Sequence, residues 1–426
     1  MLACGALLSL AAITGSVHRV RKGQCALVKW IPAIESLWRG ESIYGREVGS
    51  TREGFPALPL TAIVLTPFAA AGPIAGAIAW AAVEVALAWW IVASAFALAA
   101  GSASRFPPWA ALLVLALSAR VLLSEVAHGN VNMAVGATVA ASARAWAGGR
   151  ELRAGLWAAL GAALKVTPAL LLVYFLWKRS PRALAGSGVG LLAFLALPAL
   201  FVGWSFNLEL LAGWWRQMVE PYLGASPLSL VQTEHTNQSY LGVLARLTRD
   251  SVAIRARPPA FESDVAVNLV SLGPLAFRSV HLALVAITLA VLALRLRVPR
   301  AARDSAATLG ELSMVALAMA FLSERSWKHH YVLLALPLAY LAWTLATRPA
   351  RDRVWWSCAA ALLASGVLNG LTGSGVLGAR GSDLAEAYGA WLLGALALFA
   401  GCAVALAGGT PDAGARESRG PAPGGG

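Results

Sequence analysis

The stretch SERSWKHHYVLLALP, residues 323–337, places five ionisable side chains directly before an apolar run. They are Glu324, Arg325, Lys328, His329 and His330. A lysine ammonium and imidazole donors can stabilise negative charge on a phosphate. Adjacent histidines point apart on a helix or turn, so the pair alone does not predict a zinc site. A simpler interpretation is an aromatic and basic anchor at a membrane boundary, with Trp327 beside the cations.

Lys165 lies about midway through a second apolar run, in GAALKVTPALLL. An ammonium there costs roughly 2.5 to 3.5 kcal/mol on insertion scales, so it requires a partner. Pro168, three residues later, frees a backbone carbonyl and predicts a kink. The partner of Lys165 is therefore local backbone, a carboxylate such as Glu84, or a phosphate head group.

The stretch SEVAHGNVNMAV, residues 124–135, places His128, Asn130 and Asn132 at the edge of an apolar segment. Gly129 permits close backbone approach. Amides and a neutral imidazole offer the donors and acceptors that sugar hydroxyls need. The alternative interpretation is a polar helix cap.

A third polar motif, VQTEHTNQSYLGVLARL at residues 231–247, contains Asn237, Gln238 and Arg246. This density of polar side chains is unusual for the chain. It therefore adds two amides and one cation to the candidate site residues.

An amphipathic helix is predicted in VKWIPAIESLWRGESIYG, which begins at residue 28. One face of this helix carries Trp30, Ile34, Leu37 and Trp38. Such a pattern is typical of a helix that lies along a bilayer surface. Glu35 stands four residues before Arg39, which favours a surface ion pair. Alternatively, Glu35 or Glu41 is a carboxylate at the mouth of a membrane cavity, where partial desolvation raises its pKa towards that of a useful base.

The elements that position these residues are predicted to be membrane-spanning helices. Of the 426 residues, 58% are hydrophobic and only 13% are charged, which excludes an ordinary soluble globular protein. About twelve apolar segments approach the length that crosses a ~30 Å hydrocarbon core. They are roughly 2–17, 57–71, 74–100, 109–123, 131–147, 154–177, 183–204, 279–294, 309–323, 331–346, 354–372 and 388–407. We expect an all-α polytopic membrane protein with about 12 (10–12) transmembrane helices.

One transmembrane domain, residues 1–407, fills the chain, with large external loops at about 18–56 and 205–278. Residues 408–426 are rich in Gly and Pro, which predicts a disordered cytoplasmic tail. Three later loops are basic and fall on one side by parity, which should be cytoplasmic. Their cations are Lys178, Arg179 and Arg182, then Arg295, Arg297, Arg300 and Arg303, then Arg348, Arg351 and Arg353.

The net charge of +13 would suggest a nucleic-acid partner in a soluble protein. In a membrane protein these cations orient loops or meet anionic lipid and lipid-linked phosphate, so no nucleic-acid partner is predicted. The four cysteines show no paired spacing, and no metal or nucleotide motif is present. We predict neither a metal ion nor a cofactor.

Five motifs stand in the order found in glycosyltransferase family 87, the polyprenyl-phosphate-mannose-type transferases of the GT-C superfamily. They are RGESIYG with FPALPLTAIVLTPFA, then HGNVN, LKVTP, HTNQSYLGVLAR and SWKHHYVLLALP. The chain resembles this family from about residue 25 to about residue 345. The resemblance implies a GT-C-like helical bundle that uses a sugar on a polyprenyl phosphate, with chemistry on the extracytoplasmic side.

Family members usually carry an aspartate in the first external loop, where this sequence has Cys25, in QCALVKW. This departure leaves three alternatives open. Glu35 or Glu41 acts as the base, the donor differs, or the protein has lost activity.

Direct displacement at an anomeric carbon requires a base for the acceptor hydroxyl and stabilisation of the departing phosphate. We assign the base to Glu35, with Glu41 second. The predicted phosphate-binding residues are Lys165, Arg246, Lys328, His329 and His330. The predicted sugar-binding residues are His128, Asn130, Asn132, Asn237 and Gln238.

The resulting prediction is a hexosyltransferase of the plasma (inner) membrane that moves a hexose, as mannose, to a cell-envelope glycan or glycolipid. Two alternatives are a transporter or flippase of lipid-linked glycans and a catalytically inactive scaffold in envelope assembly. A secondary transporter would show two similar halves, and no such repeat is visible in the sequence.

Overall fold

A computed structural model describes residues 2–45, 54–224, 231–348 and 351–408. The regular elements of these residues are helices, and two isolated bridges join Ile254 to Val265 and Arg257 to Phe261. The first helices are α1 (Leu2–Arg21), α2 (Ala26–Trp38), α3 (Pro59–Ala70), α4 (Pro73–Ala100), α5 (Pro108–His128), α6 (Asn132–Ala147), α7 (Glu151–Leu164), α8 (Leu170–Trp177) and α9 (Pro181–Ala196). The others are α10 (Ala199–Val202), α11 (Trp204–Met218), α12 (Glu220–Gly224), α13 (Tyr240–Thr248), α14 (Pro274–Leu296), α15 (Ser305–Leu322), α16 (Ala335–Thr347), α17 (Arg353–Ser365), α18 (Ser374–Ala387) and α19 (Ala390–Ala407).

Seven helices of the described residues are long and apolar enough to cross a membrane. They are Pro73–Ala100, Pro108–His128, Pro181–Val202, Pro274–Leu296, Ser305–Leu322, Lys328–Thr347 and Ala390–Ala407. The pair Arg353–Gly370 and Ser374–Ala387, bent by 85°, raises the number to eight if it forms one broken span. The chain is therefore an all-helical polytopic membrane protein, and the expected count of about twelve spans is not confirmed.

The difference in count has a physical cause, because a helix can be apolar without facing lipid. The twelve predicted segments fall largely on helical residues, but several of these helices are short. Thirteen of the 16 residues of α6 are buried by neighbouring helices. Its apolar composition therefore reflects packing inside the bundle.

The apolar run 154–177 is interrupted at Lys165, as the proline in it predicts. α7 ends at Leu164, and Lys165 is extended, with φ −158° and ψ 128°. A short 3-10 helix, η2 (Thr167–Ala169), precedes α8. Pro168 cannot donate a hydrogen bond to the carbonyl oxygen of Leu164, four residues earlier, and its ring would clash with that carbonyl in a continuous helix. The break places the Lys165 side chain at a helix end within the bundle.

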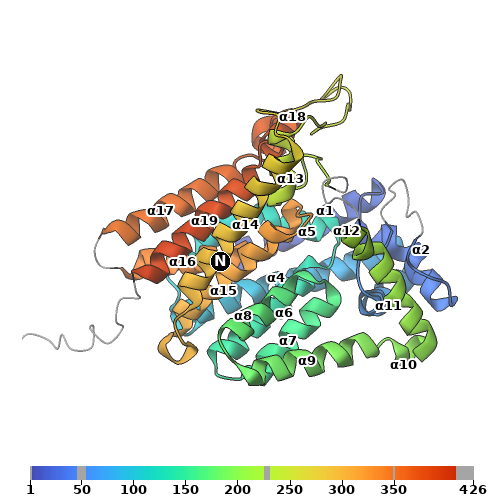
Figure 1. The fold of residues 1–426 in the computed structure, drawn as a ribbon, viewed down its shortest axis with the longest axis horizontal. Helices are drawn as coiled ribbons and strands as arrows, with labels where there is room; N and C mark the ends of the chain where they lie inside the picture. The colour runs from blue at the N-terminus through green and yellow to red at the C-terminus, as the bar shows by residue number, and fades with distance from the viewer. Residues whose placement is uncertain (1, 46–53, 225–230, 349–350, 409–426) are drawn as a thin grey trace, which may run out of the picture.

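The central helices of the bundle are α15 and α16, next to α4, α5 and α6 (Figure 1). In α15 89% of the apolar window is buried, whereas only 17% is buried in α14, which lies at the periphery. α18 lies at the top of Figure 1, and α13 lies between it and α14, with Tyr240 and Val243 packed in the main hydrophobic core. α2 packs on α3 and α4 near the start of the chain.

Two of the three basic loops meet at one end of the bundle, as their parity predicts. Lys178, after α8, donates a 2.7 Å hydrogen bond to the carbonyl oxygen of Val298. Lys178 and Arg303 both pair with the buried Glu311, at 2.7 and 2.8 Å. The hydroxyl of Tyr174 donates to the same carboxylate at 3.0 Å. One carboxylate thus joins α8, α15 and the turn after α14.

The predicted amphipathic helix is α2, and three of its four large apolar side chains are buried. Trp30, Ile34 and Leu37 pack in a small core with residues of α3 and α4. Trp38 is 47% exposed, and its indole nitrogen donates to the Thr66 hydroxyl at 3.0 Å. The predicted tail lies outside the described residues from 409 onward, as do parts of the predicted loops, 46–53 and 225–230.

Small residues allow α7 and α9 to approach each other very closely. A Cβ atom on Gly155 would stand 2.0 Å from the carbonyl oxygen of Ala183, and one on Gly186 would stand 2.2 Å from that of Leu152. Such contacts require a backbone shift, because backbone atoms cannot rotate out of the way.

Replacing Gly155 by alanine should therefore lower the free energy of unfolding by about 1 to 3 kcal/mol. Gly188→Ala is the matched control, because a Cβ atom there meets nothing within 4 Å. Both variants gain helix propensity, so only the clash separates them. Thermal unfolding in detergent measures the difference, and equal stability of the two variants would contradict the packing.

Candidate functional site

Six polar residues from four parts of the chain meet inside the bundle, and we call them the lysine-histidine cluster. They are Glu125 and His128 on α5, Asn132 on α6, Lys165 at the end of α7, and His329 and His330 on η5. The 3-10 helix η5 (Lys328–Leu334) leads directly into α16. Five of the six were predicted as site residues, and they come from three separate stretches of the sequence, which hold His128 and Asn132, Lys165, and His329 and His330.

Lys165 has two polar partners in the cluster. Its Nζ lies 2.6 Å from Asn132 Oδ1 and 2.8 Å from His330 Nε2. An ammonium group only donates, so the Asn132 oxygen accepts, and the imidazole accepts through Nε2 when the lysine is charged. The partners that Lys165 requires in its apolar run are thus an amide and an imidazole. Glu84 makes no described hydrogen bond to Lys165.

Glu125 fixes the orientation of the Asn132 side chain. Its Oε2 accepts from Asn132 Nδ2 at 3.1 Å, and its Oε1 accepts from the Asn132 backbone N–H at 2.9 Å. Because a carboxylate can only accept, the amide nitrogen faces Glu125 and the amide oxygen faces Lys165. Glu125 is fully buried.

The imidazole rings of the cluster pack on one another. His128 and His329 stack with ring centroids 4.2 Å apart and an angle of 17° between the ring planes. Trp327 stacks on His330 at 6.1 Å, and its backbone nitrogen lies 3.3 Å from His330 Nδ1. Trp327, the aromatic residue of the SWKHH motif, therefore packs against both histidines of that motif at the edge of the cluster.

The turn between α5 and α6 depends on Gly129. Its φ of +66° favours glycine, and a Cβ atom there would stand only 2.8 Å from Cys25 Sγ. The close approach predicted from HGN is confirmed, and the group that approaches is the Cys25 thiol. Asn130 contributes through its main chain, because its carbonyl oxygen accepts from the Trp80 indole at 3.0 Å.

A small cavity of about 30 Å³ borders the cluster. Its polar lining consists of Asn132, Lys165, Thr167, Ser326 and His330. This volume holds on the order of two water molecules, so a sugar phosphate requires movement of the walls. The Lys165 ammonium has two described hydrogen-bond partners, and the Lys165 side chain also lines this cavity.

Lys328 turns towards the C-terminal part of the chain. Its Nζ pairs with Glu386 at 3.1 Å, and Arg120 pairs with the same carboxylate at 3.6 Å. Glu386 is 2% exposed. No local pattern in the sequence signals this pairing, because its partners come from α5, η5 and α18.

Arg246 is fully buried and holds main-chain oxygens. Its guanidinium donates to the carbonyl oxygens of Glu234, Asn237, Glu386 and Ala387 at 2.7 to 3.2 Å. Burial lowers the pKa of this guanidinium to about 9, against the opposing effect of the Glu386 carboxylate. Through these hydrogen bonds the Arg246 side chain joins α13 to α18.

Asn237 and Gln238 are also fully buried and bonded to main chain. Asn237 Nδ2 donates to the carbonyl oxygens of Gln232 and Glu324, and its Oδ1 accepts from the Ser326 N–H. Gln238 Nε2 donates to the carbonyl oxygens of His235 and Glu386. These bonds hold the HTNQS turn against residues 324–326, and contact with a sugar stays a prediction.

Glu35 and Glu41 lie on the surface. Their side chains are 61% and 41% exposed, and they pair with Arg39 at 4.0 and 3.5 Å. This arrangement agrees with the surface ion pair that the spacing of Glu35 and Arg39 indicates. Their role as base stays a prediction.

Two buried carboxylates, Glu125 in the cluster and Glu84 beside it, were not among the predicted site residues. Glu125 stands three residues before His128, one helical turn away, and this spacing could have identified it. Glu84 on α4 is also fully buried, and neither carboxylate oxygen has a hydrogen-bond partner among the described residues. The described residues contain no group of three His, Cys, Asp or Glu that could hold a metal ion.

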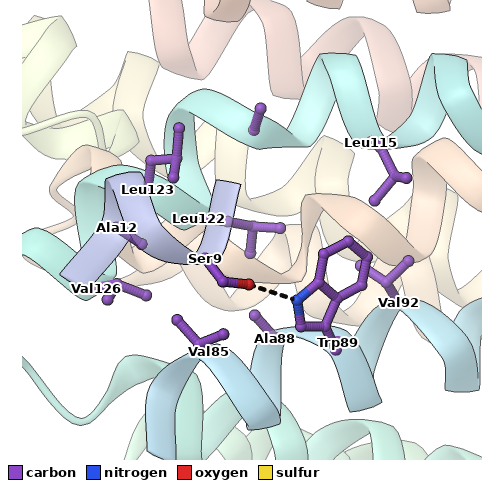
Figure 2. Close-up of a pocket in the computed structure, with 11 residues that line it drawn as sticks. Ser9, Ala12, Val85, Ala88, Trp89, Val92, Leu115, Leu122, Leu123 and Val126 are labelled. Atoms are coloured by element: carbon purple, nitrogen blue, oxygen red, sulfur yellow. Dashed lines mark hydrogen bonds between the residues drawn. The ribbon is translucent and has the colours of Figure 1, made fainter. Parts of the chain in front are cut away.

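A second cavity, of about 50 Å³, lies between α1, α4 and α5 (Figure 2). Its only hydrogen bond in the figure joins the Trp89 indole to the Ser9 hydroxyl at 3.2 Å. None of its lining residues is ionisable. It therefore offers no acid or base for chemistry.

The fold and the cluster together define a polytopic helical membrane protein with a buried polar site. Residues 58–324 match the sequence model of glycosyltransferase family 87, and the chain belongs to this family. It is a membrane glycosyltransferase. The match includes Glu125, Asn132 and Lys165, whereas Glu35 and His330 lie outside it. No curated protein and no solved structure matches the chain.

Cys25 should react slowly with thiol reagents. Its side chain is fully buried, and burial raises the pKa of its thiol, so the thiolate fraction at neutral pH is small. Alkylation measured by peptide mass spectrometry should be at least tenfold slower than at a Lys22→Cys control on the exposed turn before α2, and its rise with pH should be displaced upward. Equal rates at both positions would contradict the burial of Cys25 against Gly129.

Proposed function

We propose that this membrane glycosyltransferase transfers a hexose, as mannose, from a polyprenyl-phosphate sugar to a cell-envelope glycan or glycolipid. The reaction would take place at the extracytoplasmic face of the plasma membrane. The observation that carries the proposal is the Lys165 ammonium, held by Asn132 and His330 beside a cavity within an apolar bundle. A cation in such surroundings interacts strongly with an anion, because little water screens it.

A lipid-linked donor suits this location. A phosphate carried on a polyprenyl chain can approach the cluster from the bilayer, with its chain among apolar helices. The sequence contains no P-loop or other nucleotide-binding motif that would favour a nucleotide sugar. The donor class is thus inferred from the charge and the apolar surroundings together.

In the proposed reaction the acceptor hydroxyl oxygen attacks the anomeric carbon of the donor sugar. A base takes the hydroxyl proton, and the bond between the anomeric carbon and the phosphate oxygen breaks with its electron pair on that oxygen. Lys165 and His330 would stabilise the polyprenyl phosphate that leaves. Glu35 is the proposed base, with Glu41 second, and the amides and His128 would bind sugar hydroxyls.

An inactive assembly scaffold is the second candidate, and Cys25 favours it. A buried thiol occupies the position where the family resemblance leads us to expect an aspartate. Transfer activity separates the two candidates directly.

Purified protein in proteoliposomes should transfer mannose from a polyprenyl-phosphate donor to a glycolipid acceptor, with the product detected by mass spectrometry. Lys165→Ala and His330→Ala should each lower kcat by ~10² or more, because phosphate stabilisation is lost. Lys22→Ala, on an exposed turn, is the control and should keep full activity. Donor that stays intact with every acceptor would favour the scaffold, and lipid movement without product would favour a flippase.

Glu35→Gln tests the base and should lower kcat by ~10² or more. The substitution keeps the size of the side chain on an exposed helix face, so stability should change little. Normal turnover in this variant would remove Glu35 from the reaction and leave Glu41→Gln as the next variant to measure.

A further inference from the structure

Glu125 is a buried carboxylate to which the proposed reaction gives no role. It lies one helical turn before His128 and accepts two hydrogen bonds from Asn132. One of them, to the backbone N–H of Asn132, satisfies a donor in the first turn of α6 and is structural. The other, to the side-chain amide, continues towards Lys165.

The contacts form one ordered chain from Glu125 through Asn132 and Lys165 to His330. Each step fixes the direction of the next, because the carboxylate only accepts and the ammonium only donates. If the Asn132 amide turned over, its NH₂ group would face the ammonium and its oxygen would face the carboxylate. Both contacts would then be repulsive.

We propose that Glu125 is a positioning residue that, through the Asn132 side chain, holds Lys165 charged and directed at the leaving phosphate. This inference rests on the proposed transfer reaction. Under this proposal the negative charge of Glu125 stabilises the positive charge of Lys165, with the Asn132 amide between the two groups. The side of Lys165 that borders the cavity then stays available to the ligand.

The titratable groups that surround Lys165 come from two elements. Glu125 and His128 face it from α5, and His329 and His330 face it from η5, with Lys328 nearby on the same element. α6 contributes the amide of Asn132, and the cavity residues from α15 are apolar. Glu125 is the one acidic group among these described neighbours, and the buried Glu84 on α4 acts on Glu125 by its charge. The lysine should therefore titrate at lower pH without Glu125.

The first measurement is the pH dependence of kcat and KM for Glu125→Gln. Its NH₂ group would face the Asn132 amide and favour the overturned orientation. We expect kcat to fall by about tenfold or more with KM within about threefold, and the alkaline limb of the kcat profile to move to lower pH. A purely structural role would lower the amount of folded protein and leave the profile in place.

Asn132→Ala removes the side-chain amide between Glu125 and Lys165 but keeps the backbone N–H that donates to Glu125 at the start of α6. The variant therefore separates the positioning role of Glu125 from its structural role. This variant should show the same displacement of the alkaline limb. Adding Glu125→Gln to it should move the limb no further, because residues that act as a unit are not additive. Additive displacements would overturn the proposal, and so would an unchanged profile in both single variants.

The second measurement does not need activity. The chain has only five lysines, so the ¹⁵N resonance of Lys165 can be assigned by its loss in Lys165→Arg. Its titration should shift to lower pH in Glu125→Gln. The matched control is Glu311→Gln, which removes another buried carboxylate hydrogen-bonded to a lysine, Lys178, and should leave the Lys165 titration unchanged.

If Glu311→Gln does not fold, Glu151→Gln replaces it, because Glu151 pairs with Arg300 at a partly exposed site. An unshifted Lys165 titration in Glu125→Gln overturns the positioning role even if transfer occurs. A shifted titration in a protein that transfers no sugar shows that Glu125 keeps Lys165 charged, and it rejects the transfer reaction together with the leaving phosphate as the target of Lys165. The two failures are therefore distinguishable.

Discussion

The site depends on one constraint, that an ammonium inside an apolar bundle must be surrounded by groups that accept hydrogen bonds. Lys165 meets it at the break between α7 and η2, where Asn132 and His330 both reach its Nζ. Asn132 is in turn held by the Glu125 carboxylate, and the His330 ring stacks on Trp327. The cluster therefore brings α5, α6, α7 and η5 to one point. Pro168, which interrupts the helix after α7, and Gly129, which ends α5, both help to bring these elements together.

Sequence patterns predict the presence of the helices better than the number of spans. Hydropathy located α4, α5, α14 and α19 closely, because these helices are long and apolar throughout. It cannot separate a helix that faces lipid from one that is covered by other helices, as α6 is, since both lack polar residues. Pattern and length also cannot reveal the bend of 85° in the broken pair 353–370 and 374–387, where Arg120 donates to Asn369 and Thr372 and pairs with Glu386.

In the candidate site, too, the sequence predicts individual residues better than their arrangement. Lys165 and His330 were predictable individually, because a charge in an apolar run demands an explanation. Their contact was not, since it joins residues brought together only by the order of helices in the bundle. Glu125 gave a local signal through its spacing from His128, whereas Glu386 gave none. Arg246, Asn237 and Gln238 have the chemistry of ligand-binding residues, but their described hydrogen bonds hold main-chain groups of this chain.

The bonding of Arg246 to main-chain groups has an evolutionary consequence for the junction of α13 and α18. The hydrogen bonds described for Arg246 go to four peptide oxygens, so the side chains of residues 234, 237 and 387 do not affect them, whereas the Glu386 carboxylate also acts on the guanidinium by its charge. Related chains can change the first three side chains freely as far as these hydrogen bonds are concerned. They cannot exchange the arginine for lysine, because a single ammonium cannot span oxygens spread around a planar guanidinium. The position should thus be invariant among relatives even where its neighbours diverge.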